Sequence, residues 1–377
     1  MNLQRHFLEF LLCFIPLTLF AQRSISGRIT DADDGAPISD IHVFIDKTTI
    51  GTTTNTEGYY QLKIPGEGSY QLVVSHVAYQ PVFMEIEPGK ASKVIDIELQ
   101  IREMEDIEIV KKVKVRNNDV DLFWKTLLGE KPSKKTIHAT NPEDVYFYYN
   151  SETQKLTVSC RVPIQIVNYE TGYQIQYVLN YFTHDYKTKT SSWEGKFIFY
   201  ELKAKNYRQM QLWGKNRKNV YRVSIANLIK SLYQNTMSEN GYLFARVVTI
   251  LDSDPKWFHL ISHENFLSVD SANNCKTLNM PELWSIMLFC FGNPITEKEL
   301  QEIDDIVKAR KGWSRIGSFR NYISTPQPIQ IFPDGTYRNS LKLHPKLSSK
   351  PLNGLNMVLP IDYDPDIESY YIPDIIR

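Results

Sequence analysis

The stretch that decides the fold is Gly27–Tyr79, which reads GRITDADDGAPISDIHVFIDKTTIGTTTNTEGYYQLKIPGEGSYQLVVSHVAY. Short runs of alternating apolar and polar residues recur along it and beyond it, and Gly, Asp, Asn and Pro turns separate them. Alternation with a period of two is typical of strands that bury one face. The pattern indicates an antiparallel sandwich or barrel, with strands over residues 25–29, 41–45, 60–64, 70–74, 82–86 and 94–99. Of the two we expect a β-sandwich of the seven-stranded type.

The order of these residues also carries a family resemblance. It comprises G-R-I-T-D at 27–31, V-F-I at 43–45, T-N-x-x-G-x-Y-x-L-x-I-P at 54–65 and Y-x-L-x-V-S-H-x-x-Y at 70–79. In this order the chain resembles the carboxypeptidase-regulatory-like domain, a transthyretin-like β-sandwich, in the version carried by exported Bacteroidetes proteins and many TonB-dependent receptors. Ala78 departs from the family, which usually has Gly before the tyrosine.

The resemblance has a functional implication. In metallocarboxypeptidases this module accompanies the catalytic domain and does no chemistry itself. The resemblance therefore implies a folding, docking or binding role, and it implies no carboxypeptidase activity.

The N-terminus has the pattern of a secretory signal. Arg5 and His6 precede an apolar run over residues 7–20, and Ala21 is a small residue for cleavage before Gln22. A retained membrane anchor is the alternative, but the run is shorter than the roughly 20 apolar residues of a spanning helix. We expect residues 1–21 to be a signal peptide and the protein to reach the periplasm or the periplasmic face of the outer membrane.

Length and composition indicate a multi-unit globular protein. The chain has 377 residues, 42% of them hydrophobic, with 43 basic and 43 acidic side chains. This balance gives no electrostatic support for nucleic-acid binding, so we expect no nucleic-acid partner. We expect a mainly β protein with an α+β remainder. The predicted units are the sandwich at 22–105, an antiparallel sheet with a basic helix at 106–250, and an α+β region with an extended acidic tail at 251–377.

The segment after the sandwich predicts a linker, a helix and a sheet. Residues 102–116 are charged and indicate a linker or solvated strand, and Asn118 or Asp119 can cap a helix that ends at Gly129. Four or five antiparallel strands then form a meander over residues 145–201. One face of this meander is rich in aromatic residues, and we favour sheet core over a ligand platform for it.

Residues 203–230 contain eight cations and no acid. The apolar spacing predicts an amphipathic helix over 219–237 that ends near Asn240 and Gly241. One hypothesis is an anion-binding surface for a glycan or lipid headgroup. The other hypothesis, which we favour, is that these cations form a solvated face that pairs with tail acids such as Asp362 and Asp364. The candidate anion-binding residues are Lys203, Lys205, Arg208, Lys215, Arg217, Lys218 and Arg222.

The C-terminal third predicts short elements. We expect a strand over 241–251, a helix that begins with a capping box at Thr296 and Glu299, and a hairpin turn at Asp334 and Gly335. Further strands are expected over 322–325 and 329–332. Prolines beyond Ser348 predict an extended tail. We expect it to pack on the rest of the protein only if its apolar residues bind in a groove there.

The mature chain keeps three cysteines, because Cys13 leaves with the signal. They are Cys160, Cys275 and Cys290, so at most one internal disulfide can form, and Cys275 with Cys290 is the shortest closure. The alternative is that all three are small buried hydrophobic residues.

A search for catalytic or metal-binding residues yields no convincing set. A His-x-x-Glu pair occurs at His6 and Glu9 inside the predicted signal, and His263-Glu264 lacks the second zincin histidine because Leu267 occupies that position. His259 and His263 would share a face only in a helix. A nucleophile elbow, a phosphate loop, a dinucleotide fingerprint and a Cys-x-x-Cys pair are all missing from the sequence.

We therefore expect no catalytic, cofactor-binding or metal-binding residues and a non-enzymatic exported cell-envelope protein with a structural, docking or binding role. The expected partner is another envelope or outer-membrane protein. One alternative is a binder of anionic glycan or lipid through residues 203–230, and another is an envelope hydrolase with a dispersed site. Residues 270–272, Asp-Ser-Ala, match a short acceptor pattern for O-linked glycans, but we favour an ordinary turn for them.

Overall fold

The structure is a computed structural model, and it describes residues 23–89, 91–102, 116–129, 131–248, 257–280, 286–291, 293–309, 319–324, 327–339, 342–345, 355 and 358–365. The predicted signal peptide and most of the predicted linker lie outside these residues. The same holds for the end of the predicted tail, from residue 366 onward.

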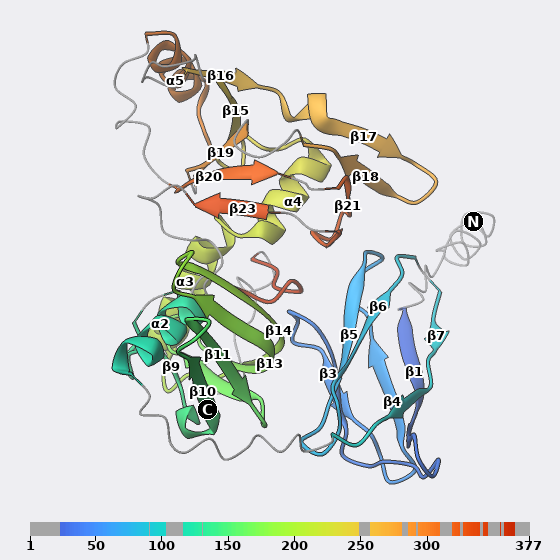
Figure 1. Cartoon of the computed structure of the whole chain (residues 1–377). Helices are drawn as coiled ribbons and strands as arrows, with labels where there is room; N and C mark the ends of the chain where they lie inside the picture. The colour runs from blue at the N-terminus through green and yellow to red at the C-terminus, as the bar shows by residue number, and fades with distance from the viewer. Residues whose placement is uncertain are drawn as a thin grey trace, which may run out of the picture.

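Two four-stranded sheets form the N-terminal sandwich (Figure 1). One sheet contains β1 (Ser24–Asp31), β4 (Tyr59–Lys63), β7 (Lys93–Val94) and β8 (Ile97–Leu99). The other contains β2 (His42–Ile45), β3 (Gly51–Thr53), β5 (Tyr70–Ser75) and β6 (Val82–Ile86). The strands follow the predicted alternation, and Ile25, Leu62 and Leu72 lie in the core between the sheets. One detail of the prediction was wrong: the sandwich is not antiparallel throughout, because β7 and β8 run parallel to β1.

Gly27 lies where the chain between β7 and β8 crosses β1. The amide of Ile95 donates to the carbonyl of Ser26 (2.8 Å), and the Tyr60 hydroxyl donates to the carbonyl of Ile95 (2.8 Å). A Cβ atom on Gly27 would lie 1.8 Å from that same carbonyl oxygen. The first glycine of the fold-determining stretch is therefore required by a close backbone approach.

A six-stranded sheet follows the sandwich. Its strands are β9 (Ile137–Ala139), β10 (Val145–Asn150), β11 (Lys155–Cys160), β12 (Ile164–Asn168), β13 (Tyr173–Asp185) and β14 (Thr190–Glu201), and the short helix η1 spans Pro142–Asp144. The sheet is antiparallel as predicted, but it is not a simple meander. The long strand β13 pairs with β12 near its start and with β11 near its end, while β14 covers its other edge.

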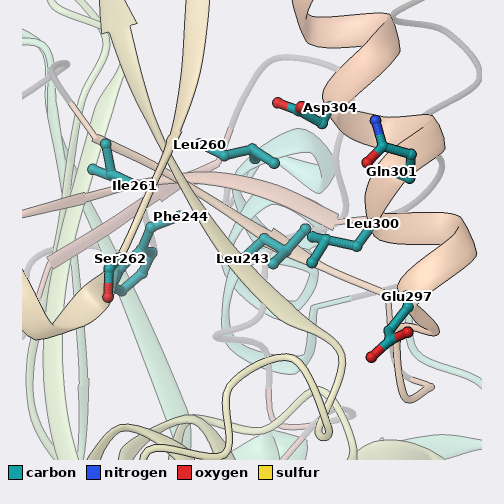
Figure 2. Close-up of a pocket in the computed structure, with 9 residues that line it drawn as sticks. All are labelled: Leu243, Phe244, Leu260, Ile261, Ser262, Glu297, Leu300, Gln301 and Asp304. Carbon is teal, nitrogen blue, oxygen red and sulfur yellow. The ribbon is translucent and has the colours of Figure 1, made fainter.

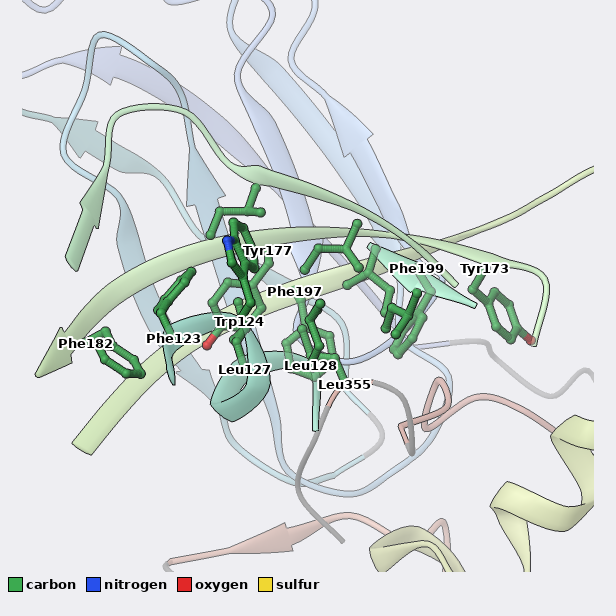
Figure 3. Packing of buried hydrophobic residues seen from close by; sticks show 14 of the residues in the cluster. Phe123, Trp124, Leu127, Leu128, Tyr173, Tyr177, Phe182, Phe197, Phe199 and Leu355 are labelled. Carbon is green, nitrogen blue, oxygen red and sulfur yellow. The ribbon is translucent and has the colours of Figure 1, made fainter. Parts of the chain in front are cut away.

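The aromatic face of this sheet is core. Helix α2 (Asn117–Leu128) lies against it and contributes Phe123, Trp124 and Leu127, which pack on buried aromatic residues of β13 and β14 (Figure 3). The tail also takes part, because Leu355, Leu359 and Tyr363 are buried in the same cluster. The core interpretation of the aromatic face is therefore confirmed. Among the described tail residues, 355 and 358–365, these three side chains pack into the core.

The helix cap predicted for α2 was wrong in its position. The N-cap residue is Arg116, and no side chain caps the helix there. Asp119 lies inside the first turn instead, where its carboxylate accepts two hydrogen bonds from the Arg116 guanidinium at 2.8 and 2.9 Å. Gly129 ends the helix in the left-handed conformation as predicted (φ 83°).

Two helices replace the single predicted basic helix. They are α3 (Tyr207–Tyr221) and α4 (Ile225–Gln234). The helix predicted over 219–237 contains α4 and only the last residues of α3, so most of α3 was missed. The prediction also ran through the break between the two helices, because the apolar spacing continues across it. Ser224 starts the second helix, because its side chain accepts a hydrogen bond from the backbone amide of Asn227.

Two further sheets complete the chain. One has β15 (Tyr242–Val248), β16 (Trp257–Ile261), β19 (Ile286–Cys290), β20 (Phe319–Ser324) and β23 (Lys342–Pro345). The other has β17 (Leu267–Asp270), β18 (Cys275–Leu278), β21 (Ile329–Ile331) and β22 (Tyr337–Arg338). The short helix η2 (His263–Phe266) precedes β17, and helix α5 (Glu297–Ala309) lies against β16 of the first sheet. The capping box of α5 is confirmed: Thr296 and Glu299 bond each other's backbone amides at 2.9 and 3.2 Å.

The packing favours a different division of this part of the chain. The predicted boundary at residue 250 falls between β15 and β16, which pair with each other. Helix α4 and strand β15 share one hydrophobic cluster with strands of both C-terminal sheets. We therefore propose that the C-terminal unit begins at Ser224.

The three cysteines are thiols in this structure. Cys275 and Cys290 are buried in different sheets, and Cys160 is half-buried. Cys275 and Cys290 therefore fit the second prediction, in which the cysteines are small buried hydrophobic residues and form no disulfide. Burial raises the pKa of the Cys160 thiol to about 11, which makes it a poor nucleophile at neutral pH.

Candidate functional site

The histidines considered for a metal site lack the arrangement that they would need. His259 lies in strand β16 and His263 in the short helix η2, so no helix gives them a common face. Over the described ranges, no three His, Cys, Asp or Glu side chains come close enough together to hold a metal ion. Residues 270–272 form part of the turn between β17 and β18, where Asp270 accepts hydrogen bonds from Asn273.

An open groove of about 400 Å³ lies between β15, β16 and α5 (Figure 2). Its residues are Leu243, Phe244, Leu260, Ile261, Ser262, Glu297, Leu300, Gln301 and Asp304. The strands supply mostly apolar side chains, and the helix adds three polar ones. This composition suits contact with another surface better than acid–base chemistry.

The structure separates the candidate anion-binding residues into two groups. Arg208, Lys215 and Arg222 are exposed and recur every seven residues along α3, which places them on one helix face. Lys203 and Lys205 are exposed in the loop before this helix. Lys218 is half-buried at the edge of the face. Leu212 and Tyr207, each 53% exposed, lie on or next to the same surface.

Arg217 belongs to the opposite, buried face of α3. It is 7% exposed, and its guanidinium donates to the carbonyls of Thr171 (2.7 Å) and Gly172 (3.3 Å). It also bonds Glu201 (3.1 Å) and lies 4.0 Å from the ring centre of Tyr173. These contacts fix α3 to the β12–β13 turn, so we remove Arg217 from the candidate anion-binding set.

One of the tail acids predicted as partners for these cations, Asp362, bonds a different residue. Asp362 accepts hydrogen bonds from the backbone amide (3.1 Å) and the hydroxyl (2.5 Å) of Thr49, a residue of the sandwich. Burial raises the pKa of the Asp362 carboxyl, and the bonds from Thr49 oppose that rise. The tail therefore binds the sandwich at this point.

The sandwich and the six-stranded sheet meet in a seam, which we define as the contacts of residues 46–50 with β14 and the tail. The Lys47 amide donates to the carbonyl of Phe197 (2.8 Å), and the Phe199 amide donates to the carbonyl of Thr48 (2.9 Å). The loop thus adds backbone hydrogen bonds to the outer edge of β14. On its other side, the Ile361 amide donates to the carbonyl of Lys47 (2.8 Å).

Buried groups reinforce the seam. Asp46 is 6% exposed, and its carboxylate accepts from the Phe197 amide (3.0 Å) and lies 4.0 Å from the Lys196 ammonium. Burial raises the pKa of this carboxyl, and the neighbouring Lys47 and Lys196 charges oppose that rise. Beside them, Phe44 of the sandwich packs on Ile198 of β14, and both are fully buried. Removing a partner of such a buried charge lowers the stability of the fold strongly, because the charge is then left unpaired.

A second contact joins the sandwich to the C-terminal sheets. The Asp334 carboxylate, in the turn between β21 and β22, accepts from the Gly68 amide (2.9 Å) and the Tyr70 hydroxyl (2.8 Å). Arg338 of β22 bonds Glu85 (2.7 Å) and Glu87 (2.9 Å) of the sandwich. A Cβ atom on Gly68 would lie 1.9 Å from the hydroxyl oxygen of Thr336, so the glycine permits this close approach.

Replacing Asp334 with alanine should lower the free energy of unfolding by about 2–3 kcal/mol, because the Gly68 amide and the partly buried Tyr70 hydroxyl lose a charged acceptor. Urea unfolding of the full chain measures this loss. Asp121→Ala, which removes an exposed aspartate of α2, serves as the matched control and should stay within about 0.5 kcal/mol of the original. Equal losses in the two variants would contradict the contact's importance.

Sequence reasoning missed both contacts. Asp46 and Phe197 in the seam are 151 residues apart, and Gly68 and Asp334 in the second contact are 266 apart. Each residue taken alone has the pattern of an ordinary strand end or turn. One signal was present: Pro65-Gly66-Glu67-Gly68 has more glycine than a simple reversal needs.

Comparison with known proteins tests the family resemblance. Residues 25–111 match the family model of the CarboxypepD_reg-like domain. The sandwich is a carboxypeptidase-regulatory-like domain. Over 101 residues the chain is also 26% identical to the TonB-dependent receptor P3 of Formosa agariphila. That match covers 26% of this chain and 10% of the receptor, so the chain spans about a tenth of the curated relative's length.

Solved structures show weaker similarity. A putative membrane-associated protein of unknown function from Bacteroides fragilis is 12% identical, with 42% of this chain and 64% of that chain covered and a TM-score of 0.18. A cohesin–X-dockerin complex from Acetivibrio cellulolyticus is 23% identical, with 20% of this chain and 52% of that chain covered and a TM-score of 0.18. Scores this low carry no argument about the function of the regulatory-like domain or of the remainder. Within the residues that the structure describes, no helix is long and apolar enough to cross a membrane.

Proposed function

We propose that the protein is a non-enzymatic, exported cell-envelope protein that docks another envelope or outer-membrane protein. The observation that carries this proposal is the seam. Hydrogen bonds join the regulatory-like domain to β14, to the tail and to the β21–β22 turn. Such a junction suits a rigid scaffold that presents fixed surfaces to a partner. The match of part of the chain to a TonB-dependent receptor supports an envelope location.

The docking role can be tested by crosslinking in intact cells of the source organism. A tagged full-length chain should fractionate with the envelope and should yield one discrete crosslinked partner, recovered again when that partner carries the tag. Asp334→Ala should weaken the crosslink, because it loosens the scaffold, and Asp121→Ala should not. Recovery in the cytoplasm would contradict the proposal. Peptide hydrolysis by the purified chain would favour the hydrolase alternative.

A second candidate function is supported by the exposed face of α3. Three cations on one face, with two further lysines before the helix and exposed Leu212 and Tyr207 beside them, have the composition of a surface that contacts anionic lipid headgroups. The exposed side chain of Arg222 also donates to Asn293 (3.3 Å), which is a neutral partner.

The full chain should therefore sediment with phosphatidylglycerol vesicles and not with phosphatidylcholine vesicles. Combined replacement of Arg208, Lys215 and Arg222 with glutamine should weaken this binding by about tenfold or more, since each cation near an anionic surface contributes about 1 kcal/mol. Raising the salt concentration should have the same effect. The control replaces Lys131, Lys134 and Lys135, which lie in a different loop. Salt-insensitive binding would contradict this second function.

A further inference from the structure

A polar hollow lies on the outer face of the regulatory-like domain, over β1 and β4. Its volume is about 750 Å³, and it is open to solvent. The residues that line it are Ser26, Gly27, Arg28, Asn55, Tyr59, Tyr60, Gln61, Val94 and Asp96. We call it the β1–β4 hollow. The strands β1, β4 and β7 lie on the side of the sandwich turned away from β13 and β14, so the seam does not cover it (Figure 1).

Tyr59 gives the hollow an exposed aromatic surface. It is 51% exposed and stands directly opposite Arg28 in the register of β1 and β4. The Arg28 guanidinium lies 5.5 Å from the centre of the ring and donates through Nε to the carbonyl of Glu57 (3.0 Å). The ring therefore has a neighbour that limits its movement while half of its surface stays open to solvent.

Planar polar side chains line the same hollow as this ring. The Asn55 side-chain oxygen accepts from the amides of Glu57 (3.0 Å) and Tyr59 (2.9 Å), so the local fold uses its acceptor and not its two N–H donors. One oxygen of Asp96 accepts from the Arg28 amide (2.8 Å). Gln61, exposed and opposite Ser26, adds both a donor and an acceptor. Asn55, Gln61 and Asp96 thus bring both donors and acceptors to the lining of one hollow.

The charge and residue types of the hollow define its ligand. The positive charge of Arg28 and the negative charge of Asp96 cancel, so the hollow favours neither an anion nor a cation. Paired donors and acceptors match vicinal hydroxyl groups, and an exposed aromatic ring matches the C–H face of a sugar. We infer that the β1–β4 hollow binds a neutral oligosaccharide, with one sugar ring stacked on Tyr59 and its hydroxyls bonded to Asn55, Gln61 and Asp96. This inference goes beyond the docking role and does not depend on it.

An array of neutral and anionic oligosaccharides, probed with the full mature chain, tests the inference. We expect binding to at least one neutral member that persists at high salt. Tyr59→Ala should weaken that binding by about tenfold or more, since removal of a central aromatic anchor has effects of this size. Tyr59→Phe should keep most of it, because the ring remains. Gln61→Ala should reduce it through lost hydrogen bonds.

Tyr146→Ala is the matched control, because Tyr146 is 50% exposed on β10, outside the sandwich, and should leave binding unchanged. Thermal unfolding of every variant checks that the sandwich is intact. Three results would each overturn the inference: no neutral oligosaccharide is bound, Tyr59→Ala binds as the original chain does, or only anionic members bind and salt abolishes their binding. The last result would assign glycan binding to α3 instead.

Discussion

Replacing Gly27 with alanine is expected to lower the free energy of unfolding of the sandwich by about 3 kcal/mol or more. The new Cβ atom would lie 1.8 Å from the carbonyl oxygen of Ile95 and 2.5 Å from its carbonyl carbon, and both are backbone atoms. Relief of this clash requires the chain between β7 and β8 to move away from β1. That movement breaks the bond from the Ile95 amide to Ser26 and the bond from Tyr60.

Gly35→Ala provides the matched control. Gly35 has a φ of 71°, and an added Cβ would meet no atom within 4 Å, so alanine there is penalised by backbone conformation alone, by about 1–2 kcal/mol. Urea unfolding followed by circular dichroism compares the two variants. If Gly27→Ala were no more destabilising than Gly35→Ala, the close approach at Ile95 would not explain the glycine.

Replacing Arg217 with alanine should lower the free energy of unfolding by about 2–4 kcal/mol, because the carbonyls of the buried Thr171 and Gly172 lose their charged donor. Contact with the Tyr173 ring is lost as well. Arg217→Lys should recover only part of the loss, since lysine keeps the charge but lacks the planar fork that reaches two carbonyls. Chemical unfolding of the full chain measures these differences.

Lys215→Ala on the exposed face of α3 is the control for Arg217 and should change stability by less than about 0.5 kcal/mol. The same proteins should also be tested on phosphatidylglycerol vesicles. A variant at Arg217 that is as stable as the original chain but binds these vesicles less well would return Arg217 to the anion-binding set.

Much of the fold follows from local patterns. The alternation over residues 25–86 predicts the strands of the sandwich, and the Thr296 and Glu299 pair predicts the start of α5, because each of these features depends on neighbours in the sequence. The break between α3 and α4 was missed for the opposite reason. The apolar spacing continues through Val220 and Val223, so the pattern shows no interruption there. Ser224 is one of several polar residues in this part of the sequence, and only the structure shows that it caps a second helix.

The candidate sites were less predictable than the fold. Arg217 and Lys215 are equivalent in a count of charges, and only the packing of α3 on the β12–β13 turn distinguishes a buried residue from an exposed one. The β1–β4 hollow brings together residues from 26 to 96, whose side chains look like ordinary surface positions of separate strands. A pattern with a period of two tells which side chains face outward but not which of them meet.

The position of Thr49 and Asp362 has a consequence for the order of folding. A chain leaves the ribosome from its N-terminus, and domains fold largely as they emerge. The sandwich is complete by residue 99, whereas its bond to Asp362 joins residues 313 apart. Contacts of such large sequence separation form late and slow the final step of folding. The bond from Thr49 to Asp362 can therefore form only after most of the chain has been made, whereas Ile198 of β14 can already pack on Phe44 and Val73 of the sandwich.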